Sequence, residues 1–169
     1  GSIEATHGSA LTFVKGYDTF VTITHNVNLV CTYPLTIEAY IYVPGSVEDR
    51  MTIFSTSNNT AGSAWTFEVG KGSGTATDTG RLVMSGISGA TIIRESVNNT
   101  IKSNTWHHVL AKVTGTAAGN TYLYVDDIEV TYQSAGNSFG YLSNTTSKFI
   151  GCRTAGGDNS FIGIIKRVK

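Results

Sequence analysis

Few carboxylates are placed where they could hydrolyse a glycosidic bond. Retaining glycoside hydrolases use two carboxyl groups about 5–5.5 Å apart, which along one strand requires acidic residues two or four positions apart. The chain has only 12 acidic residues, and no strand-like segment shows that spacing. Glu38 and Glu68 each stand alone in such a segment, whereas Asp126 and Asp127 are adjacent. The sequence therefore predicts a protein that is not an enzyme, unless Glu38 and Glu68 face a common cleft.

Histidine and cysteine residues are spaced unfavourably for a metal site. His107 and His108 are adjacent, and neighbours in a strand point to opposite faces, so the two cannot hold one ion together. Cys31 and Cys152 lack the C-x-x-C spacing of zinc and redox sites. They could form a disulfide that closes a long loop or remain two buried thiols, and both alternatives stay open. We expect no bound metal and no cofactor.

Aromatic and polar side chains offer a different chemistry, the binding of sugars. Aromatic rings pack against the C–H faces of pyranose rings, while amide, carboxylate and guanidinium groups bond to the hydroxyls. Tyr40 and Trp65 also fit positions in a core, so both interpretations remain open for them. The candidate ligand-binding residues are Trp65, Tyr40, Tyr42, Arg94, Asn58 and Tyr132.

The elements that must position these residues are strands. Residues 35–43 (LTIEAYIYV) alternate with period two, so that Leu35, Ile37, Ala39, Ile41 and Val43 share one face and Thr36, Glu38, Tyr40 and Tyr42 share the other. Pro44 and Gly45 end this strand with turn chemistry. The polar and aromatic face is a candidate for the open side of a sheet.

Similar short runs recur along the chain, and glycine, asparagine, aspartate or serine lies in nearly every gap between them. Asp126 and Asp127 separate two such runs, which predicts a tight hairpin because aspartate tolerates positive φ. We expect an all-β fold, a two-sheet antiparallel sandwich. The runs are residues 20–24, 51–55, 65–69, 81–85, 91–95, 106–113, 121–125, 128–132, 148–150 and 161–168.

Composition argues against nucleic-acid-binding and membrane-associated classes of protein. Charged residues make up 14% of the chain, and the formal net charge is zero, which argues against nucleic acid and against an anionic membrane as partners. No run of 18 apolar residues is present, so no membrane span is predicted. Residues 1–2 are typical of a tag remnant, and we expect residues 3–169 to form a single domain.

Six motifs occur in an order that resembles concanavalin A-like, laminin G-like jelly-roll domains. Each motif is weak alone, but together they cover essentially the whole chain. The resemblance implies a jelly roll in which Trp106 belongs to the core and one of the two histidines beside it is structural. The motifs are ALTF with GYDTFV (10–13 and 16–21), LTIEAYI (35–41), WHHVLA (106–111), YLYVDD (122–127), FIG (149–151) and FIGII (161–165).

One departure from this family concerns calcium. The last motif of the family often carries an aspartate that helps to hold a structural Ca²⁺, and Lys166 stands at that position here. A protonated amine cannot ligate the ion, which requires several oxygens. We therefore expect the usual calcium site to be absent, although aspartates in turns elsewhere keep a different site open.

Two functions remain in view. The first is a non-catalytic carbohydrate-binding module that recognises a glycan or polysaccharide, because the resemblance implies a lectin-like fold and catalytic carboxylates are missing. The alternative is a structural or adhesive domain of a cell-surface, phage or viral assembly. For either function we expect a secreted or cell-surface protein, with further domains possible in a longer chain.

Overall fold

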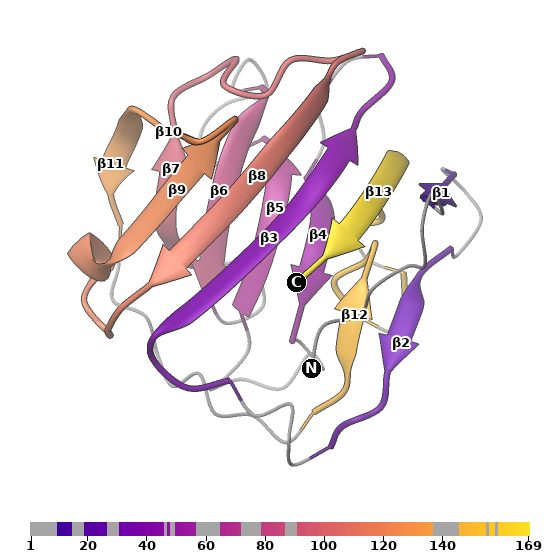
Figure 1. Ribbon diagram of the computed structural model, residues 1–169, viewed down its shortest axis with the longest axis horizontal. Coiled ribbons are helices and arrows are strands. Elements are labelled where there is room, and N and C mark those ends of the chain that lie inside the picture. The colour runs from indigo at the N-terminus through magenta and orange to yellow at the C-terminus, as the bar shows by residue number, and fades with distance from the viewer. Residues whose placement is uncertain are drawn as a thin grey trace.

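Two antiparallel sheets packed face to face form the domain (Figure 1). The computed structural model describes residues 10–14, 19–26, 31–45, 47, 50–56, 65–71, 79–86, 91–136, 146–154, 156–157 and 159–169. Every strand pairing within these residues is antiparallel. The predicted all-β sandwich is thereby confirmed.

The front sheet of Figure 1 has six strands in the described part of the chain, and the rear sheet has seven. In spatial order the six-stranded sheet contains β1 (Leu11–Phe13), β13 (Gly163–Val168), β3 (Leu35–Tyr42), β8 (Trp106–Val113), β9 (Thr121–Val125) and β10 (Ile128–Glu129). The seven-stranded sheet contains β11 (Tyr132–Ala135), β7 (Thr91–Ser96), β6 (Arg81–Gly86), β5 (Trp65–Gly70), β4 (Met51–Ser55), β12 (Lys148–Ile150) and β2 (Val21–Ile23).

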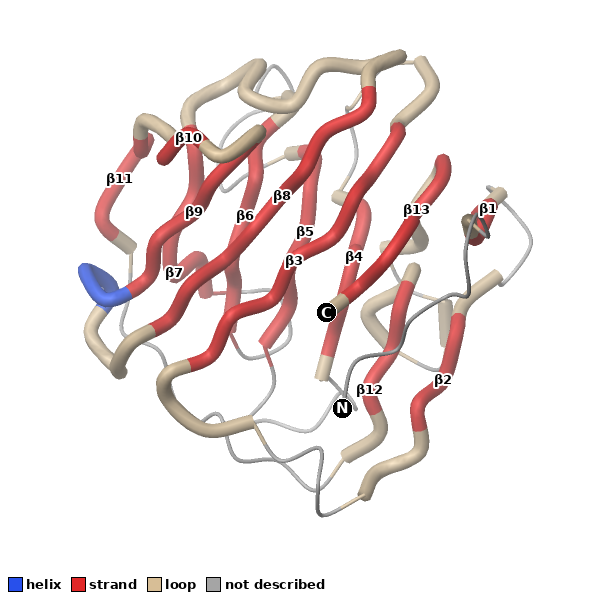
Figure 2. Tube along the Cα trace, viewed as in Figure 1, coloured by secondary structure: helices blue, strands red, loops and turns tan. Residues whose placement is uncertain are grey.

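Helical structure is confined, among the described residues, to one 3-10 turn at Ala118–Asn120 (Figure 2). No helix there is long and apolar enough to cross a membrane. The connections that the structure describes are turns and loops, as the frequent glycine, asparagine and serine residues between the strands predict.

The core lies between the sheets and is built by period-two alternation. In β3 the burial of Ile37, Ala39 and Ile41 alternates with more exposed neighbours, as the sequence predicts. The seven-stranded sheet contributes Phe67 and Met84 from the opposite side. Each fully buried side chain of this size stabilises the fold by roughly 1.5–3 kcal/mol relative to exposure. This packing leaves the even-numbered side chains of β3 on the outer surface.

The β9–β10 hairpin turns at Asp126 and Asp127, where the sequence predicts it. Their φ angles are 53° and 67°, which is the left-handed pair that a two-residue type I′ turn requires. Ile128 pairs with Val125 across the turn. The prediction is confirmed, and the turn carries two carboxylates to one end of β8.

The two tryptophans have exchanged the environments that we expected: Trp65, a candidate ligand-binding residue, is buried, and Trp106, expected in the core, is exposed. Trp65 is 2% exposed and belongs to the core, whereas Trp106 is 46% exposed. The prediction that Trp106 lies in the core is therefore wrong, because side chains alternate between the two faces of β8 and Trp106 is on the outer one. In β8 the buried residues are His107, Val109, Ala111 and Val113, so Trp106 points outward.

Both cysteines are present as thiols rather than as a disulfide. The Sγ of Cys152 is buried and donates to the carbonyl oxygen of Thr154 at 3.1 Å. Burial raises the pKa of the Cys31 thiol, although the nearby Lys148 ammonium lowers it in part. The structure thus selects the thiol alternative, and no covalent link joins the regions around residues 31 and 152.

We predict opposite stability effects for the two tryptophans. Trp65→Ala removes a core ring and is expected to lower the free energy of unfolding by about 3–5 kcal/mol. Trp106→Ala removes a ring that is already largely in water and is expected to lower it by about 1 kcal/mol or less. Urea denaturation of the two variants measures the difference, and equal losses would contradict the placement.

Candidate functional site

The outer surface of the six-stranded sheet carries a set of aromatic side chains that we call the aromatic face. It is formed by outward-pointing residues of four adjacent strands, β13, β3, β8 and β9 (Figure 1). Register places them in rows across the sheet. The residues are Thr36, Glu38, Tyr40, Tyr42, Trp106, His108, Leu110, Lys112, Tyr122, Tyr124, Ile164 and Lys166.

The first row of the aromatic face pairs Tyr42 with Trp106. The two residues are register partners on β3 and β8, and their ring centroids lie 5.6 Å apart with the planes tilted by 47°. Ile164 of β13 is the register partner of Tyr42 on its other side. Two broad rings and an aliphatic side chain thus line one end of the open sheet.

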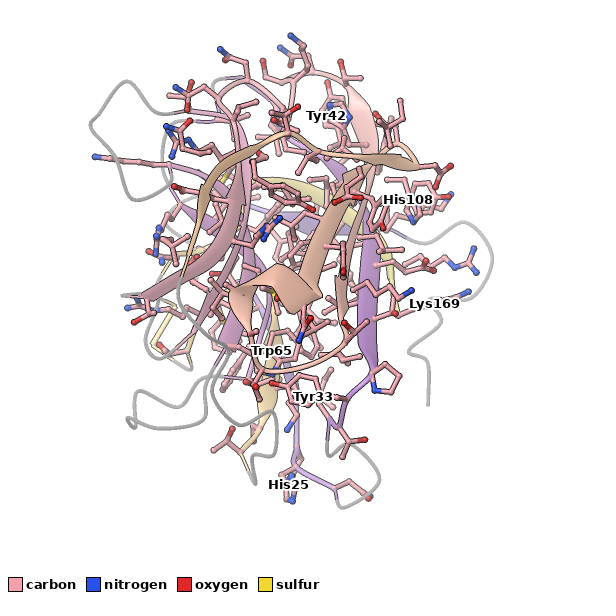
Figure 3. All side chains as sticks on the ribbon, turned by 90° about the vertical axis from the view of Figure 1, so that its left-hand side faces the viewer. His25, Tyr33, Tyr42, Trp65, His108 and Lys169 are labelled. Carbon is pink, nitrogen blue, oxygen red and sulfur yellow. The ribbon has the colours of Figure 1, made fainter. Side chains whose placement is uncertain are left out.

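The second row is centred on Tyr40, which is 39% exposed. Its ring stacks on that of His108, with centroids 4.7 Å apart and planes within 22°. The histidine is flanked by two carboxylates: Nε2 lies 3.5 Å from Oε2 of Glu38, and Nδ1 lies 3.1 Å from Oδ1 of Asp127. Figure 3 shows His108 pointing away from the sandwich, on the same side as Lys169. Aromatic and hydrogen-bonding groups therefore stand side by side in this row.

His107 points inward and has the structural role that the family resemblance implies. Its Nε2 accepts the backbone N–H of Lys102 at 3.0 Å, so its Nδ1 carries the proton and donates to Oδ2 of Asp126 at 2.8 Å. The other carboxylate oxygen of Asp126 accepts the N–H of His108 at 2.9 Å. These bonds tie the loop before β8 to the β9–β10 hairpin, and they hold the chain on both sides of Trp106.

Two lysines at the C-terminal end of the chain lie beside the aromatic face, one on β13 and one just after it. Lys166 is exposed and is the register partner of Tyr40. Lys169 follows the strand, with Nζ 3.8 Å from Oε1 of Glu38. Within the residues that the structure describes, no group of three His, Cys, Asp or Glu side chains could hold a metal ion. Whether a calcium site exists elsewhere stays a prediction.

Trp65 cannot act as a stacking platform for a sugar. Its ring lies between the sheets (Figure 3), where it packs against Phe54 with centroids 5.4 Å apart. The prediction that Trp65 binds ligand is therefore wrong, because the alternation of β5 turns Trp65, Phe67 and Val69 inward. Asn58 lies outside the described residues.

Arg94 and Tyr132 form a brace between the two sheets. The guanidinium carbon of Arg94 lies 3.7 Å from the Tyr132 ring centroid, and Nη1 donates to the carbonyl of Ala118 at 3.4 Å. The Tyr132 hydroxyl accepts the N–H of Leu123 at 3.0 Å and donates to Oε1 of Glu129 at 2.8 Å. One ring face and the hydroxyl are thus engaged within the protein, away from Tyr40 and Tyr42.

Glu38 and Glu68 do not face a common cleft. Glu38 is on the aromatic face, whereas Glu68 points outward from the seven-stranded sheet on the other side of the core. The buried Glu68 carboxylate lies 3.2 Å from the hydroxyls of both Thr52 and Ser85, and 3.6 Å from Nη1 of Arg50. The hypothesis that the two glutamates form a catalytic pair is therefore wrong.

The two rings that contact Tyr42 and Tyr40, those of Trp106 and His108, were absent from the sequence-based candidates. Trp106 was assigned to the core, and His108 was considered as a metal ligand or as a structural residue but not as part of a binding surface. The missed signal is in the strand itself: Val109, Ala111 and Val113 alternate with Leu110 and Lys112. That pattern turns the even-numbered residues outward and brings both side chains to the face of Tyr40 and Tyr42.

The chain belongs to the concanavalin A-like lectin/glucanases superfamily, whose laminin G-type family model matches residues 15–169. No curated protein matches the chain. The superfamily assignment confirms the resemblance drawn from the ordered motifs.

Solved structures share the fold at low sequence identity. Domain 4 of AbnA, a GH43 extracellular arabinanase from Geobacillus stearothermophilus in complex with arabinotriose, aligns with a TM-score of 0.62 and 14% identity over 99% of this chain and 72% of that chain. Domains LG4-5 of the mouse laminin alpha1 chain align with a TM-score of 0.60 and 15% identity, over 95% of this chain and 40% of that chain. The CBM40 of a Ruminococcus gnavus IT-sialidase, solved bound to alpha2,3 sialyllactose, aligns with a TM-score of 0.59 and 13% identity over 90% of each chain.

We predict that the Tyr132 brace weakens in alkali. Burial is the main cause that raises the pKa of Tyr132 to about 12, from an ordinary value of 10.0. Between these two pH values the unfolded chain loses the phenolic proton while the folded chain retains it, so this group destabilises the fold as pH rises.

Tyr132→Phe is the matched variant, because it keeps the ring under Arg94 but has no proton to lose. At pH 7 it is expected to be less stable by roughly 1–3 kcal/mol, since the N–H of Leu123 loses its acceptor. This difference is expected to shrink as pH rises from about 10 to about 12, measured by urea denaturation at each pH. A constant difference would contradict the raised pKa.

Proposed function

We propose that this domain binds carbohydrate without catalysis, through the aromatic face. The observation that carries the proposal is the contact of half-buried Tyr42 with exposed Trp106, beside exposed Tyr40, on the open side of the sheet. Exposed aromatic surface on an otherwise well-packed domain is typical of an interaction site. The register of β3 with β8 holds these rings without ligand, so little ordering is needed on binding.

The arrangement of the face suits an extended sugar chain rather than a single ring. Tyr42 and Tyr40 are two residues apart on β3, which separates their rows by about 6–7 Å along the strand. Trp106 and Tyr42 offer the faces on which pyranose C–H groups pack, while Glu38 and His108 offer polar groups for hydroxyls. A polysaccharide lying across both rows would use the two kinds of group together.

The charges on the face favour binding over catalysis. On β3 the carboxylate is Glu38, whose Oε1 faces Lys169 and whose Oε2 faces His108. A glycosidase requires a second carboxyl group across the scissile bond. The other carboxylate near this row, Asp127, lies 3.1 Å from Nδ1 of His108, so the imidazole stands between it and Glu38, and Glu68 lies on the opposite side of the sandwich. This supports a module that recognises a glycan and leaves its hydrolysis to other domains.

The likeness to sugar-binding structures supports the same class of function. The arabinanase domain was solved with arabinotriose and the CBM40 with sialyllactose, and a further neighbour is the carbohydrate-binding module CBM66 of Bacillus subtilis. We propose that this domain likewise acts outside the cell, on a glycan or polysaccharide, as one part of a longer protein.

Affinity gel electrophoresis tests the proposal. A panel of neutral and acidic polysaccharides is cast into native gels, and we expect at least one to retard the wild-type protein. Tyr42→Ala and Trp106→Ala each remove a stacking surface and are expected to raise the Kd derived from the retardation by up to about tenfold, since an aromatic contact is worth about 0.5–1.5 kcal/mol beyond the area that it buries.

Ile128→Ala is the control, because it removes an apolar side chain that is 72% exposed on β10, outside the aromatic face. It is expected to leave retardation unchanged. If no polysaccharide retards the protein while light scattering shows a stable oligomer, the structural or adhesive function is favoured instead and the proposal fails.

A further inference from the structure

A groove of about 320 Å³ opens at the end of the sandwich where β3 ends and β6 and β8 begin. Buried Val47 and Ile101 supply its apolar lining, and Thr79, Asn99, Lys102 and Ser103 supply polar groups. The volume is at the lower end of the range of small-molecule sites, about 300–1,000 Å³. It has room for one sugar-sized ring rather than for a polymer.

The walls of this groove are fixed by backbone hydrogen bonds. Gly80 donates to the carbonyl of Val47 at 3.1 Å and accepts from the N–H of Ile101 at 2.7 Å, while Asn99 donates to Thr79 at 2.9 Å. The N–H of Lys102 is held by Nε2 of His107 at 3.0 Å. Three separate loops are thus joined, and the groove exists without a ligand.

Gly80 shows how closely the walls approach one another. Its φ is +63°, and a Cβ at this position would lie 2.6 Å from the carbonyl oxygen of Ile101. Asn99 also has a positive φ, 59°. These two conformations bring the 99–103 loop against the start of β6, which closes one side of the groove.

The chemistry of the lining selects a hydroxylated anion. Val47 and Ile101 are only 5% and 3% exposed, so the groove is recognised mainly through its hydroxyl and amide side chains, which match sugar hydroxyls. Lys102 is the cation of the lining, and it is exposed, so its ammonium can turn to a carboxylate.

We propose that this groove is a second binding site, distinct from the aromatic face, for a single hydroxylated carboxylate of the uronic acid class. Lys102 bonds the carboxylate, and Asn99 and the hydroxyl side chains bond the ring hydroxyls. The proposal does not depend on the function of the aromatic face, because none of the aromatic side chains lines the groove.

The test is an NMR titration of the isotope-labelled full chain with D-glucuronate and with D-glucose, which differ in the carboxylate. We expect glucuronate to shift the amide signals of Gly80, Asn99 and Lys102 and to bind at least about fivefold more tightly than glucose. Lys102→Gln is expected to abolish this preference. Asn99→Gly, which tolerates the positive φ, is expected to weaken both sugars.

Lys112→Gln is the matched control, because Lys112 is an exposed lysine of β8 outside the groove, and it is expected to leave the glucuronate preference unchanged. Trp106→Ala is likewise expected to leave the glucuronate titration unchanged, which separates this site from the aromatic face. The proposal is overturned if neither sugar shifts the groove signals, if both bind equally well, or if Lys102→Gln has no effect.

Discussion

The pairing of β3 with β8 is the constraint on which the rest of the structure depends. Eight consecutive residues of each strand are register partners, from Leu35 with Val113 to Tyr42 with Trp106. Because side chains alternate along both strands, one register settles both faces at once. It places Ile37, Ala39, Val109 and Ala111 in the core, and it places Tyr40, Tyr42, Trp106 and His108 on the outer face of the sheet. A shift by one residue would bury the tyrosines and expose the core.

Polar contacts at the strand ends hold the loops beside the aromatic face in place. His107 joins the loop before β8 to the Asp126 turn, so the same imidazole that supports one wall of the groove also fixes the strand that presents Trp106. At the far edge, Tyr132 and Arg94 connect the two sheets. Buried polar groups of this kind are stable only when they are hydrogen-bonded. Their geometry therefore limits how far the loops around the aromatic face can move.

Local pattern was sufficient for the fold and for part of the site. Alternation in residues 35–43 predicted the outward placement of Tyr40 and Tyr42, and two adjacent aspartates predicted the hairpin. The same alternation of side chains along β5 and β8 places Trp65 inside and Trp106 outside. For Trp106 the family resemblance was followed instead, and it led to the wrong placement. Other features depend on contacts between distant segments, which periodicity does not encode. The brace of Arg94 on Tyr132 requires β7 to pair with β11, and the groove requires three loops to meet.

The central claim is that Trp106 is part of a ligand-binding surface on the open sheet. The protein has two tryptophans, and Trp65 is buried, so a Trp65→Phe variant reports on Trp106 alone. Its fluorescence is measured with acrylamide as a quencher, during titration with a polysaccharide that retards the protein. The account predicts a saturable change in emission and protection of Trp106 from the quencher. Binding with unchanged emission and unchanged quenching would contradict it.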